Sequence, residues 1–206
     1  LELAKVLEGT NVWVLSDEIY EKLVYDGQFV SFAGLSADAF ARTVTVNGFS
    51  KSYALTGWRI GYAAGPRNVL DAMIMLQGQS TSGVASIVQK GALAALGVSN
   101  GEIEREVASL KKRRDLMCEI LGRVKDLDFV TPNGAFYVFV DISKYLGYRG
   151  LPQTDDEFAL YLLQTKNVGS VPGAGFGAPG FLRISFAVSE ADVREGTEKL
   201  VSMFAR

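Results

Sequence analysis

Residues 48–62, with the sequence GFSKSYALTGWRIGY, combine a lysine and an arginine that could together hold a phosphorylated aldehyde. Lys51 closely follows a buried apolar run, and Arg59 lies further along the same segment. A lysine amine can form a Schiff base with an aldehyde, and an arginine offers several N–H donors to a phosphate. Pyridoxal 5'-phosphate carries both groups. The spacing indicates Lys51 as the covalent anchor and Arg59 as the phosphate ligand, and the Ser50 hydroxyl could donate to another phosphate oxygen.

Asp17 and Tyr20 follow an earlier apolar run, residues 11–15, which we interpret as a buried strand. In α/β sheets, ligands bind outside the carboxyl ends of the strands, so Asp17 and Lys51 can face one crevice. A carboxylate beside the pyridine nitrogen would keep that nitrogen protonated, which makes the ring a stronger electron sink. The Tyr20 hydroxyl could bond the phenolic oxygen of the ring. The structural alternatives are a turn or helix-capping aspartate and an ordinary packed tyrosine.

Arg183 lies in the strand-like run 181–186, between apolar residues. A guanidinium in such surroundings requires an anionic partner. The fork of an arginine matches a carboxylate in bidentate geometry, as in the α-carboxylate of an amino acid. The alternative is an internal pair with an Asp or Glu.

The composition limits the chemistry that the chain can perform. Its 206 residues are 48% hydrophobic and 21% charged, which is typical of a globular protein, and the formal net charge is -2. We therefore expect no binding to nucleic acid or membranes, and a cytoplasmic location, or a plastid one if an upstream transit peptide is missing. The absence of histidine removes Ser-His and Cys-His nucleophiles and most zinc sites, so we expect no metal site. The single cysteine, Cys118, is expected to be a packed thiol within a helix.

The first half of the chain indicates an α/β layer, because apolar runs alternate with helical patterns. Strands are predicted for three runs: 11–15, 43–46 and 60–64. Helices are predicted for four segments: 36–41, 68–76, 85–96 and 101–125. We place the domain boundary near Ser109, so that residues 1–108 form one domain and residues 109–206 another.

The second half indicates a small α+β domain. Strands are predicted around four segments: 129–130, 135–140, 168–171 and 181–186. One helix should begin at the capping box Thr154–Glu157, and a closing helix should follow Ser189.

Three further stretches could be mistaken for functional motifs. Residues 173–177 are rich in glycine but lack dinucleotide spacing, and residues 78–83 lack the Lys-Ser/Thr of a phosphate loop. The basic run Lys111–Arg114 points around a helix and does not form one face, so we interpret it as a solvated helix.

Four short motifs occur in the order and spacing found in class I aminotransferases. They are SDEIY at 16–20, NGFSKS with TGWR at 47–59, PNGAFY at 132–137 and FLRISF at 181–186. The chain resembles the C-terminal half of a fold-type I pyridoxal-phosphate enzyme, and is most similar to the bacterial and plastid aspartate or prephenate aminotransferases. The likeness covers essentially the whole chain.

The resemblance implies a fold and a set of roles. The fold would be the C-terminal part of a mostly parallel α/β/α cofactor domain, followed by a small α+β domain. Lys51 would bind the cofactor aldehyde and, once displaced, move a proton between the substrate α-carbon and the cofactor. The other matched positions imply cofactor contacts by Asp17, Tyr20, Ser50 and Arg59, and a substrate contact by Arg183.

The implied reaction moves an amino group from an amino acid, such as aspartate or glutamate, to a 2-oxo acid, in a homodimer whose small domain closes over the site. Relatives carry further cofactor residues upstream, so the chain by itself is expected to be inactive. Two other interpretations remain open. One is a lyase or decarboxylase on the same scaffold, and the other is an aminotransferase-like ligand-sensing domain of a transcription regulator.

Overall fold

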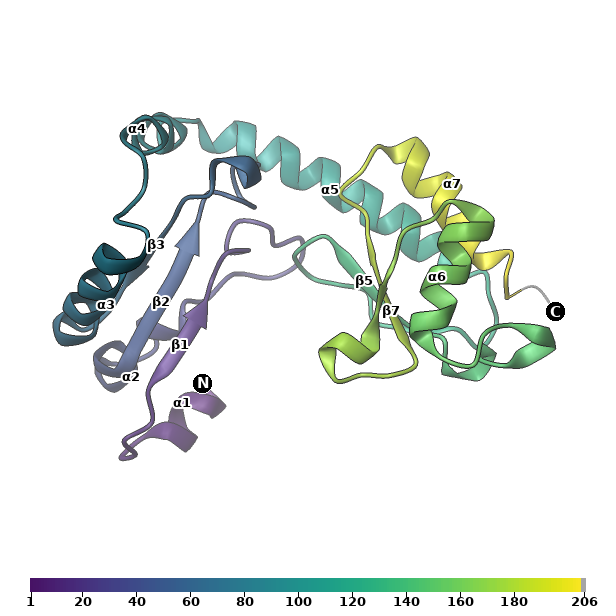
Figure 1. Ribbon diagram of the computed structural model, residues 1–206, viewed down its shortest axis with the longest axis horizontal. Coiled ribbons are helices and arrows are strands. Elements are labelled where there is room, and N and C mark those ends of the chain that lie inside the picture. Colours follow the sequence, from purple (N-terminus) through teal and green to yellow (C-terminus); the bar gives the residue numbers. More distant parts are fainter. Residues whose placement is uncertain (205–206) are drawn as a thin grey trace. The chain divides into compact units, whose positions relative to one another are not determined.

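The computed structural model describes residues 1–204, except for the side chain of Asn100, and the chain divides into two compact units, Leu1–Arg105 and Glu106–Arg206 (Figure 1). The division falls inside helix α5 (Asn100–Leu121), as does the boundary that we placed near Ser109. Each unit has a sheet of its own.

The first unit contains a three-stranded sheet in the order β1-β2-β3. β1 (Val14–Asp17) is parallel to β2 (Thr43–Gly48), and β3 (Gly61–Ala64) is antiparallel to β2. This sheet is mixed because the segment between β2 and β3 is short and reverses the chain, whereas helix α2 (Ala37–Arg42) lies in the longer connection between the parallel pair.

Two glycines face each other where β2 and β3 meet, since Gly48 is paired with Gly61. A Cβ on Gly48 would lie 2.9 Å from the carbonyl oxygen of Ile60, and a Cβ on Gly61 would lie 2.9 Å from that of Asn47. Such approaches to backbone exclude any larger residue. The pair therefore lets the segment after β2 lie against the start of β3.

The first unit also contains α1 (Glu2–Leu7), α2, α3 (Arg67–Ser80) and α4 (Ser86–Ala95). Ser36 caps the N-terminus of α2, because its Oγ accepts a hydrogen bond from the Ala39 N–H at 3.0 Å. Arg42, at the end of α2, donates to the carbonyl oxygens of Thr10 at 2.7 Å and Val12 at 3.0 Å. These bonds attach the segment before β1 to α2.

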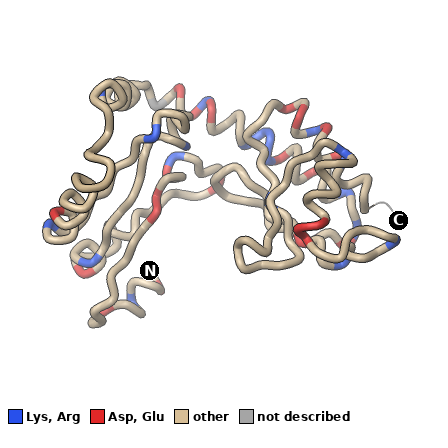
Figure 2. Tube along the Cα trace, in the orientation of Figure 1, with Lys and Arg blue, Asp and Glu red and all other residues tan. Residues whose placement is uncertain are grey.

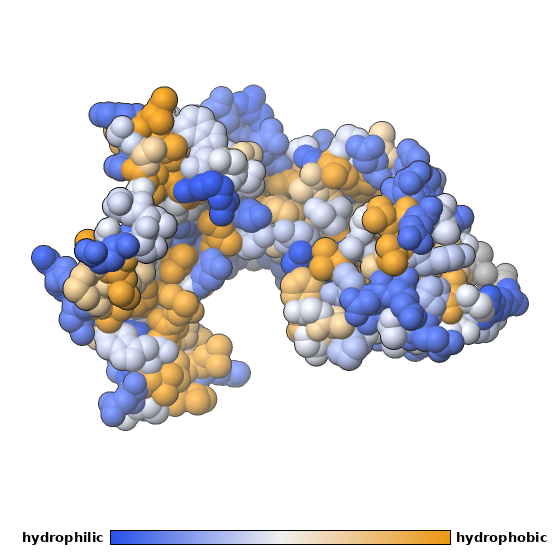
Figure 3. Space-filling model, viewed as in Figure 1, coloured by the Kyte–Doolittle hydropathy of each residue, from blue (hydrophilic) through white to orange (hydrophobic). Residues whose placement is uncertain are grey.

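The first unit buries few apolar side chains and exposes many. Leu15 on β1 is 73% exposed and Ile74 on α3 is 67% exposed. Figure 3 shows apolar residues gathered on the surface around α1 and β1. Apolar surface of this extent is unusual for a unit that is stable by itself.

The second unit is built around an antiparallel sheet in the order β4-β5-β7-β6. Its strands are β4 (Asp128–Phe129), β5 (Tyr137–Asp141), β6 (Val171–Pro172) and β7 (Phe181–Ser185). The helices that accompany it are α6 (Asp155–Lys166), α7 (Glu190–Val201) and the later turns of α5.

Side chains alternate across β5 and β7, so that the two faces of the sheet differ. One face carries the buried residues Val138, Val140, Leu182 and Ile184. Together with fully buried residues of the helices, such as Ile120 and Phe158, they form the core of the second unit. The opposite face is half-buried and carries Tyr137, Phe139, Phe181 and Arg183.

A buried carboxylate attaches α6 to the glycine-rich loop that precedes β7. The loop contains the 3-10 helix Gly173–Phe176, and Oδ2 of Asp155 accepts a hydrogen bond from the Ala174 N–H at 2.7 Å. Thr154 caps α6, because its Oγ1 accepts from the Glu157 N–H at 3.2 Å, which is one half of the predicted capping box. The Glu157 carboxylate accepts from the Gln153 N–H at 3.1 Å instead of from Thr154. The sequence pattern does not single out Asp155.

Several predicted boundaries were wrong by a few residues. Residues 11–13 precede β1 because the partner strand begins at Thr43, opposite Val14. The helix predicted to reach residue 125 ends at Leu121, and a turn follows in which Asp126 has a φ of 67°. The strand predicted at 168–171 is reduced to Val171–Pro172.

The basic run Lys111–Arg114 is not wholly solvated, so that interpretation was wrong for Arg114. Arg114 is 4% exposed and donates to the Pro132 carbonyl oxygen at 2.9 Å and to Asp115 Oδ1 at 2.7 Å. Figure 2 shows charges of both signs along α5. Burial raises the pKa of Cys118 on the same helix, which agrees with a packed thiol.

Within the stretch that the structure describes, none of the helices is both long enough and apolar enough to cross a lipid bilayer.

Candidate active site

A pocket of about 600 Å³ opens at the carboxyl ends of β1 and β2 in the first unit. Its lining includes all five residues to which we assigned cofactor contacts: Asp17, Tyr20, Ser50, Lys51 and Arg59. The parallel pairing of β1 with β2 accounts for this meeting, because parallel strands end at the same edge of a sheet.

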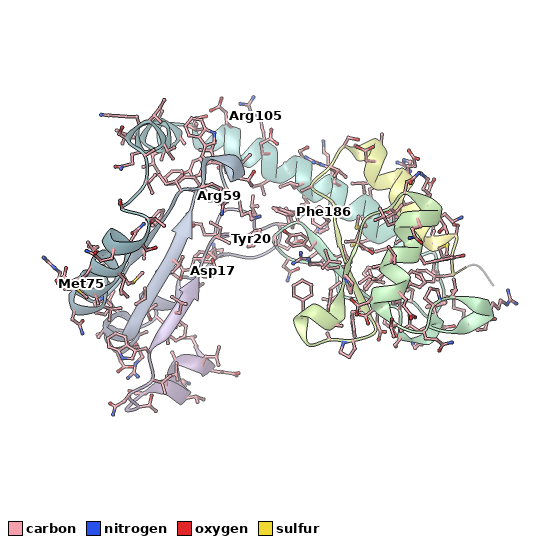
Figure 4. The ribbon with its side chains drawn as sticks, in the orientation of Figure 1. Asp17, Tyr20, Arg59, Met75, Arg105 and Phe186 are labelled. Atoms are coloured by element: carbon pink, nitrogen blue, oxygen red, sulfur yellow. The ribbon has the colours of Figure 1, made fainter. Side chains whose placement is uncertain are left out.

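Asp17 is the last residue of β1 and is paired with Val46 of β2. Its Oδ1 accepts a hydrogen bond from the Ile19 N–H at 3.2 Å, so it also forms the turn that was the structural alternative. The side chain is exposed at the pocket. Figure 4 shows Asp17 at the end of β1 and Tyr20 on the turn that follows. The turn bond uses one carboxylate oxygen and leaves the other available to a ligand.

Lys51 lies on the turn that follows β2. Backbone hydrogen bonds from Tyr53 and Leu55 to the Phe49 carbonyl oxygen, at 3.3 and 3.2 Å, hold this turn, and the Phe49 side chain is buried. The Lys51 side chain is half-buried, and its Nζ lies 5.8 Å from the centroid of the Tyr20 ring. The anchor candidate is thus held on a fixed loop and beside an aromatic ring.

Arg59 ends the 3-10 helix Thr56–Trp58 in a left-handed conformation, with φ 51° and ψ 51°. This conformation is unfavourable for a residue with a side chain and indicates a constrained position. Its Nη1 donates to the Thr56 carbonyl oxygen at 2.9 Å, and no acidic residue within 1–204 forms an ion pair with it. The exposed guanidinium therefore has N–H groups to offer to an anion.

Trp58 helps to hold the turn that carries Arg59. Its side chain is 44% exposed. Its indole ring nevertheless packs on α4, where a Cβ added to Gly91 would collide with ring atom Cζ3. The close packing of Trp58 on Gly91 thus supports the position of Arg59.

Arg183 belongs to the second unit, where it lies on β7. Its guanidinium carbon lies 4.4 Å from the centroid of the Tyr137 ring and 4.5 Å from that of Phe176. Its Nε is buried without a hydrogen-bond partner, and no acidic residue of the described chain pairs with it. The internal ion pair that we considered as the alternative is thus not found in the described part.

Two further polar residues at or near the pocket were not among the predicted site residues. Asn47, which is 4% exposed, lines it, and its Oδ1 accepts from the Gly48 N–H at 2.7 Å. A polar residue at the carboxyl end of an apolar strand was the available signal. Glu18 is buried and accepts from Ser16 Oγ at 3.0 Å and Ser31 Oγ at 2.8 Å. Nothing in its sequence context distinguishes it from a surface glutamate.

Comparison with known proteins identifies the family. A family model described as "Aminotransferase class I and II" matches residues 1–200. The chain belongs to the class I and II aminotransferase family.

Relatives within this family are similar along nearly the whole chain. An aspartate aminotransferase of Rhizobium meliloti (strain 1021) is 43% identical over 97% of the chain and 50% of its own length. A bifunctional aspartate aminotransferase and glutamate/aspartate-prephenate aminotransferase of Petunia hybrida is 41% identical over 91% of the chain and 40% of its own length. The chain thus spans about half the length of the curated relatives that it matches.

Solved aminotransferase structures share the fold. The aspartate aminotransferase of Rhizobium meliloti superposes with a TM-score of 0.89 at 42% identity, covering 98% of the chain and 52% of the relative. An aromatic aminotransferase from Pyrococcus horikoshii gives a TM-score of 0.87 at 33% identity, covering 97% and 52%. The expected fold, part of a fold-type I enzyme, is confirmed.

Proposed function

We propose that the protein that carries this chain is a pyridoxal-phosphate-dependent aminotransferase, which moves an amino group between an amino acid and a 2-oxo acid. The observation that carries the proposal is that Asp17, Tyr20, Ser50, Lys51 and Arg59 line one pocket. Together they offer a carboxylate, a phenol, a hydroxyl, an amine and a guanidinium. Each polar group of the cofactor would therefore find a suitable partner.

The polar groups of the pocket fit this cofactor. Among the residues that the structure describes, Arg59 makes one side-chain hydrogen bond, to the Thr56 carbonyl oxygen, and no ion pair, and the Ser50 hydroxyl makes no hydrogen bond. Both side chains can therefore bind a phosphate. When bound, the cofactor supplies an aldehyde for covalent attachment and a ring that withdraws electrons from the substrate α-carbon. The Lys51 amine would provide the attachment point.

Three residues of the chain would then hold or move protons during the reaction. The Asp17 carboxylate would hold a proton on the pyridine nitrogen, because an adjacent negative charge favours the protonated ring. The Tyr20 hydroxyl would donate a hydrogen bond to the phenolic oxygen. Once the substrate amine has displaced it, Lys51 would act as the base that takes the α-proton.

Arg183 would bind the α-carboxylate of the substrate. Its unpaired Nε supports this role, as does its lack of an acidic partner within residues 1–204. The names of the relatives suggest aspartate, glutamate or prephenate as partners in the reaction. A homodimer is part of the same proposal.

Reductive trapping tests the proposal. The protein is mixed with pyridoxal 5'-phosphate, reduced with borohydride and mapped by peptide mass spectrometry. We expect the label on Lys51 and its loss in Lys51→Ala. Lys22→Ala is the matched control, because Lys22 also lies against an aromatic ring, at 6.0 Å from the centroid of Tyr53, but does not line the pocket. A label elsewhere, or none, would rule out Lys51 as the anchor.

A further inference from the structure

Arg183 is held by two aromatic rings that come from different elements. Tyr137 lies on β5, two residues from Phe139, which is the register partner of Arg183. Phe176 lies at the end of the 3-10 helix Gly173–Phe176. Both ring centroids are within 4.5 Å of the guanidinium carbon. Rings at this distance attract a guanidinium through its flat face and leave the N–H groups at its edge available.

The loop that presents Phe176 is itself fixed. Asp155 accepts a hydrogen bond from the Ala174 N–H at 2.7 Å, and the Gly177 N–H donates to the Ala174 carbonyl oxygen at 3.0 Å. Gly173 is buried, and a Cβ there would collide with the Ala178 carbonyl oxygen. The backbone at both ends of the 3-10 helix is therefore restrained.

The ring of Phe176 is also in contact with its neighbours. It meets Phe139 edge to face at 6.2 Å, and Phe139 stacks on Phe181 at 4.9 Å. Phe176 is nevertheless 51% exposed, so its place over Arg183 is not explained by burial of the ring. An arginine that lies against fixed rings has fewer conformations available than a free one.

We propose that Phe176, together with Tyr137, is a positioning residue that holds the guanidinium of Arg183 in the orientation that a carboxylate needs. The proposal rests on the proposed function, which assigns Arg183 to the α-carboxylate. The buried Nε, which lacks a partner, belongs to a guanidinium whose central carbon lies within 4.5 Å of both ring centroids. A carboxylate in the plane of the fork would then bind without first ordering a long side chain.

The affinity of maleate tests this inference in the protein that carries this chain, loaded with pyridoxal phosphate. Maleate offers carboxylates but no amine, and its binding is followed through the visible absorbance of the cofactor. We expect Phe176→Leu to raise the Kd of maleate about two- to ten-fold, which is the effect of ordering one arginine side chain on binding. Phe176→Tyr keeps the ring and should change the Kd less than about two-fold.

Tyr161→Leu is the matched control, because Tyr161 is a partly exposed aromatic residue of the same unit, on α6, but is not one of the rings that lie against Arg183. It should leave the Kd unchanged. Thermal unfolding of all variants shows whether a change in Kd accompanies a loss of folded protein. In steady-state assays, Phe176→Leu should raise KM for the amino acid more than it lowers kcat.

A double-mutant cycle with Arg183→Lys separates positioning from direct contact. If Phe176 acts through Arg183, adding Phe176→Leu to the Arg183→Lys variant should not raise the Kd of maleate any further. An equal effect in both backgrounds would show that Phe176 contacts the ligand itself and would overturn the proposal, as would an unchanged Kd in Phe176→Leu. If Arg183→Lys leaves the Kd unchanged, Arg183 does not bind the carboxylate, and its role in the proposed function fails as well. The label on Lys51 is independent of all these outcomes.

Discussion

The amine of Lys51 lies 5.8 Å from the centroid of the Tyr20 ring, although one residue follows β1 and the other follows β2. Tyr20→Phe keeps this ring and removes only its hydroxyl. If the hydroxyl donates to the phenolic oxygen of the cofactor, its loss should raise the pH midpoint of the cofactor's absorbance change. A pH titration of the absorbance measures this midpoint. Tyr53→Phe, outside the pocket lining, should leave it unchanged, and an unchanged midpoint in Tyr20→Phe would refute the role of the hydroxyl.

Asp17→Asn should preserve the fold and remove most of the activity. The amide oxygen can still accept the hydrogen bond from the Ile19 N–H, but the negative charge that we propose beside the pyridine nitrogen is lost. We expect kcat to fall by roughly a hundred-fold or more, the size found when one preorganised electrostatic group is removed. Asp71→Asn, on the exposed face of α3, should have no effect on kcat. Similar activities for the two variants would show that Asp17 is only a turn residue.

Gly91→Ala should disturb the turn that carries Arg59, because the added methyl group collides with the Trp58 ring. We expect a loss of about 1–3 kcal/mol in the free energy of unfolding, typical of overpacking, together with weaker cofactor binding. Gly78→Ala is the control, since a Cβ there meets no atom within 4 Å. In a helix this control should stabilise by up to about 1 kcal/mol. Denaturant unfolding measures the stability of both variants, and titration with the cofactor measures its affinity for each. Equal stabilities and affinities in Gly91→Ala and Gly78→Ala would show that the close packing of Trp58 on Gly91 does not hold the turn.

Asp155 should make the second unit sensitive to acid. Burial alone would raise its pKa, but the backbone N–H groups of Ala174, Gly180 and Gly173 outweigh that effect and hold the pKa below the ordinary value of 3.8. A carboxyl whose pKa is lowered in the folded state contributes stability above its unfolded pKa, and this contribution is lost as the pH falls through the folded value. Asp155→Asn should therefore lower the free energy of unfolding by about 1–3 kcal/mol at neutral pH. In this variant the free energy of unfolding should also fall less steeply as the solution is made acidic.

Unfolding experiments at pH 7 and below pH 4 measure this contribution. Asp156→Asn is the control, because Asp156 is the exposed neighbour in the same first turn of α6. If the free energy of unfolding fell as steeply with acid in Asp155→Asn as in the unchanged protein, Asp155 would not be the source of the acid sensitivity.

The parts of the site that depend on strand ends could be predicted from the sequence. Lys51 and Asp17 follow apolar runs, and the rule that parallel strands end at one edge of a sheet predicts that the two residues share a crevice. The structure has both residues in the lining of one pocket. Their chemical roles stay predictions.

The parts that depend on packing between distant segments could not be predicted. The buried state of Arg114 follows from its bond to the Pro132 carbonyl oxygen, which lies in a loop with no pattern that points to it. The sequence indicates only a glycine-rich loop around Phe176, and the contact of this ring with Arg183 depends on how the loop folds back on the sheet. Helix and strand ends were missed for a related reason, because a strand such as β1 begins only where its partner does.

The proposed cofactor residues all belong to one of the two units, and their placement bears on the lifetime of the protein. They lie in Leu1–Arg105, whereas Arg183 belongs to Glu106–Arg206. A ligand that binds only the folded form stabilises it by an amount that grows with the ligand's concentration. Small changes in stability alter how much of a protein escapes proteolysis in a cell. Scarcity of the proposed cofactor would thus reduce the amount of the protein as well as the fraction that carries it.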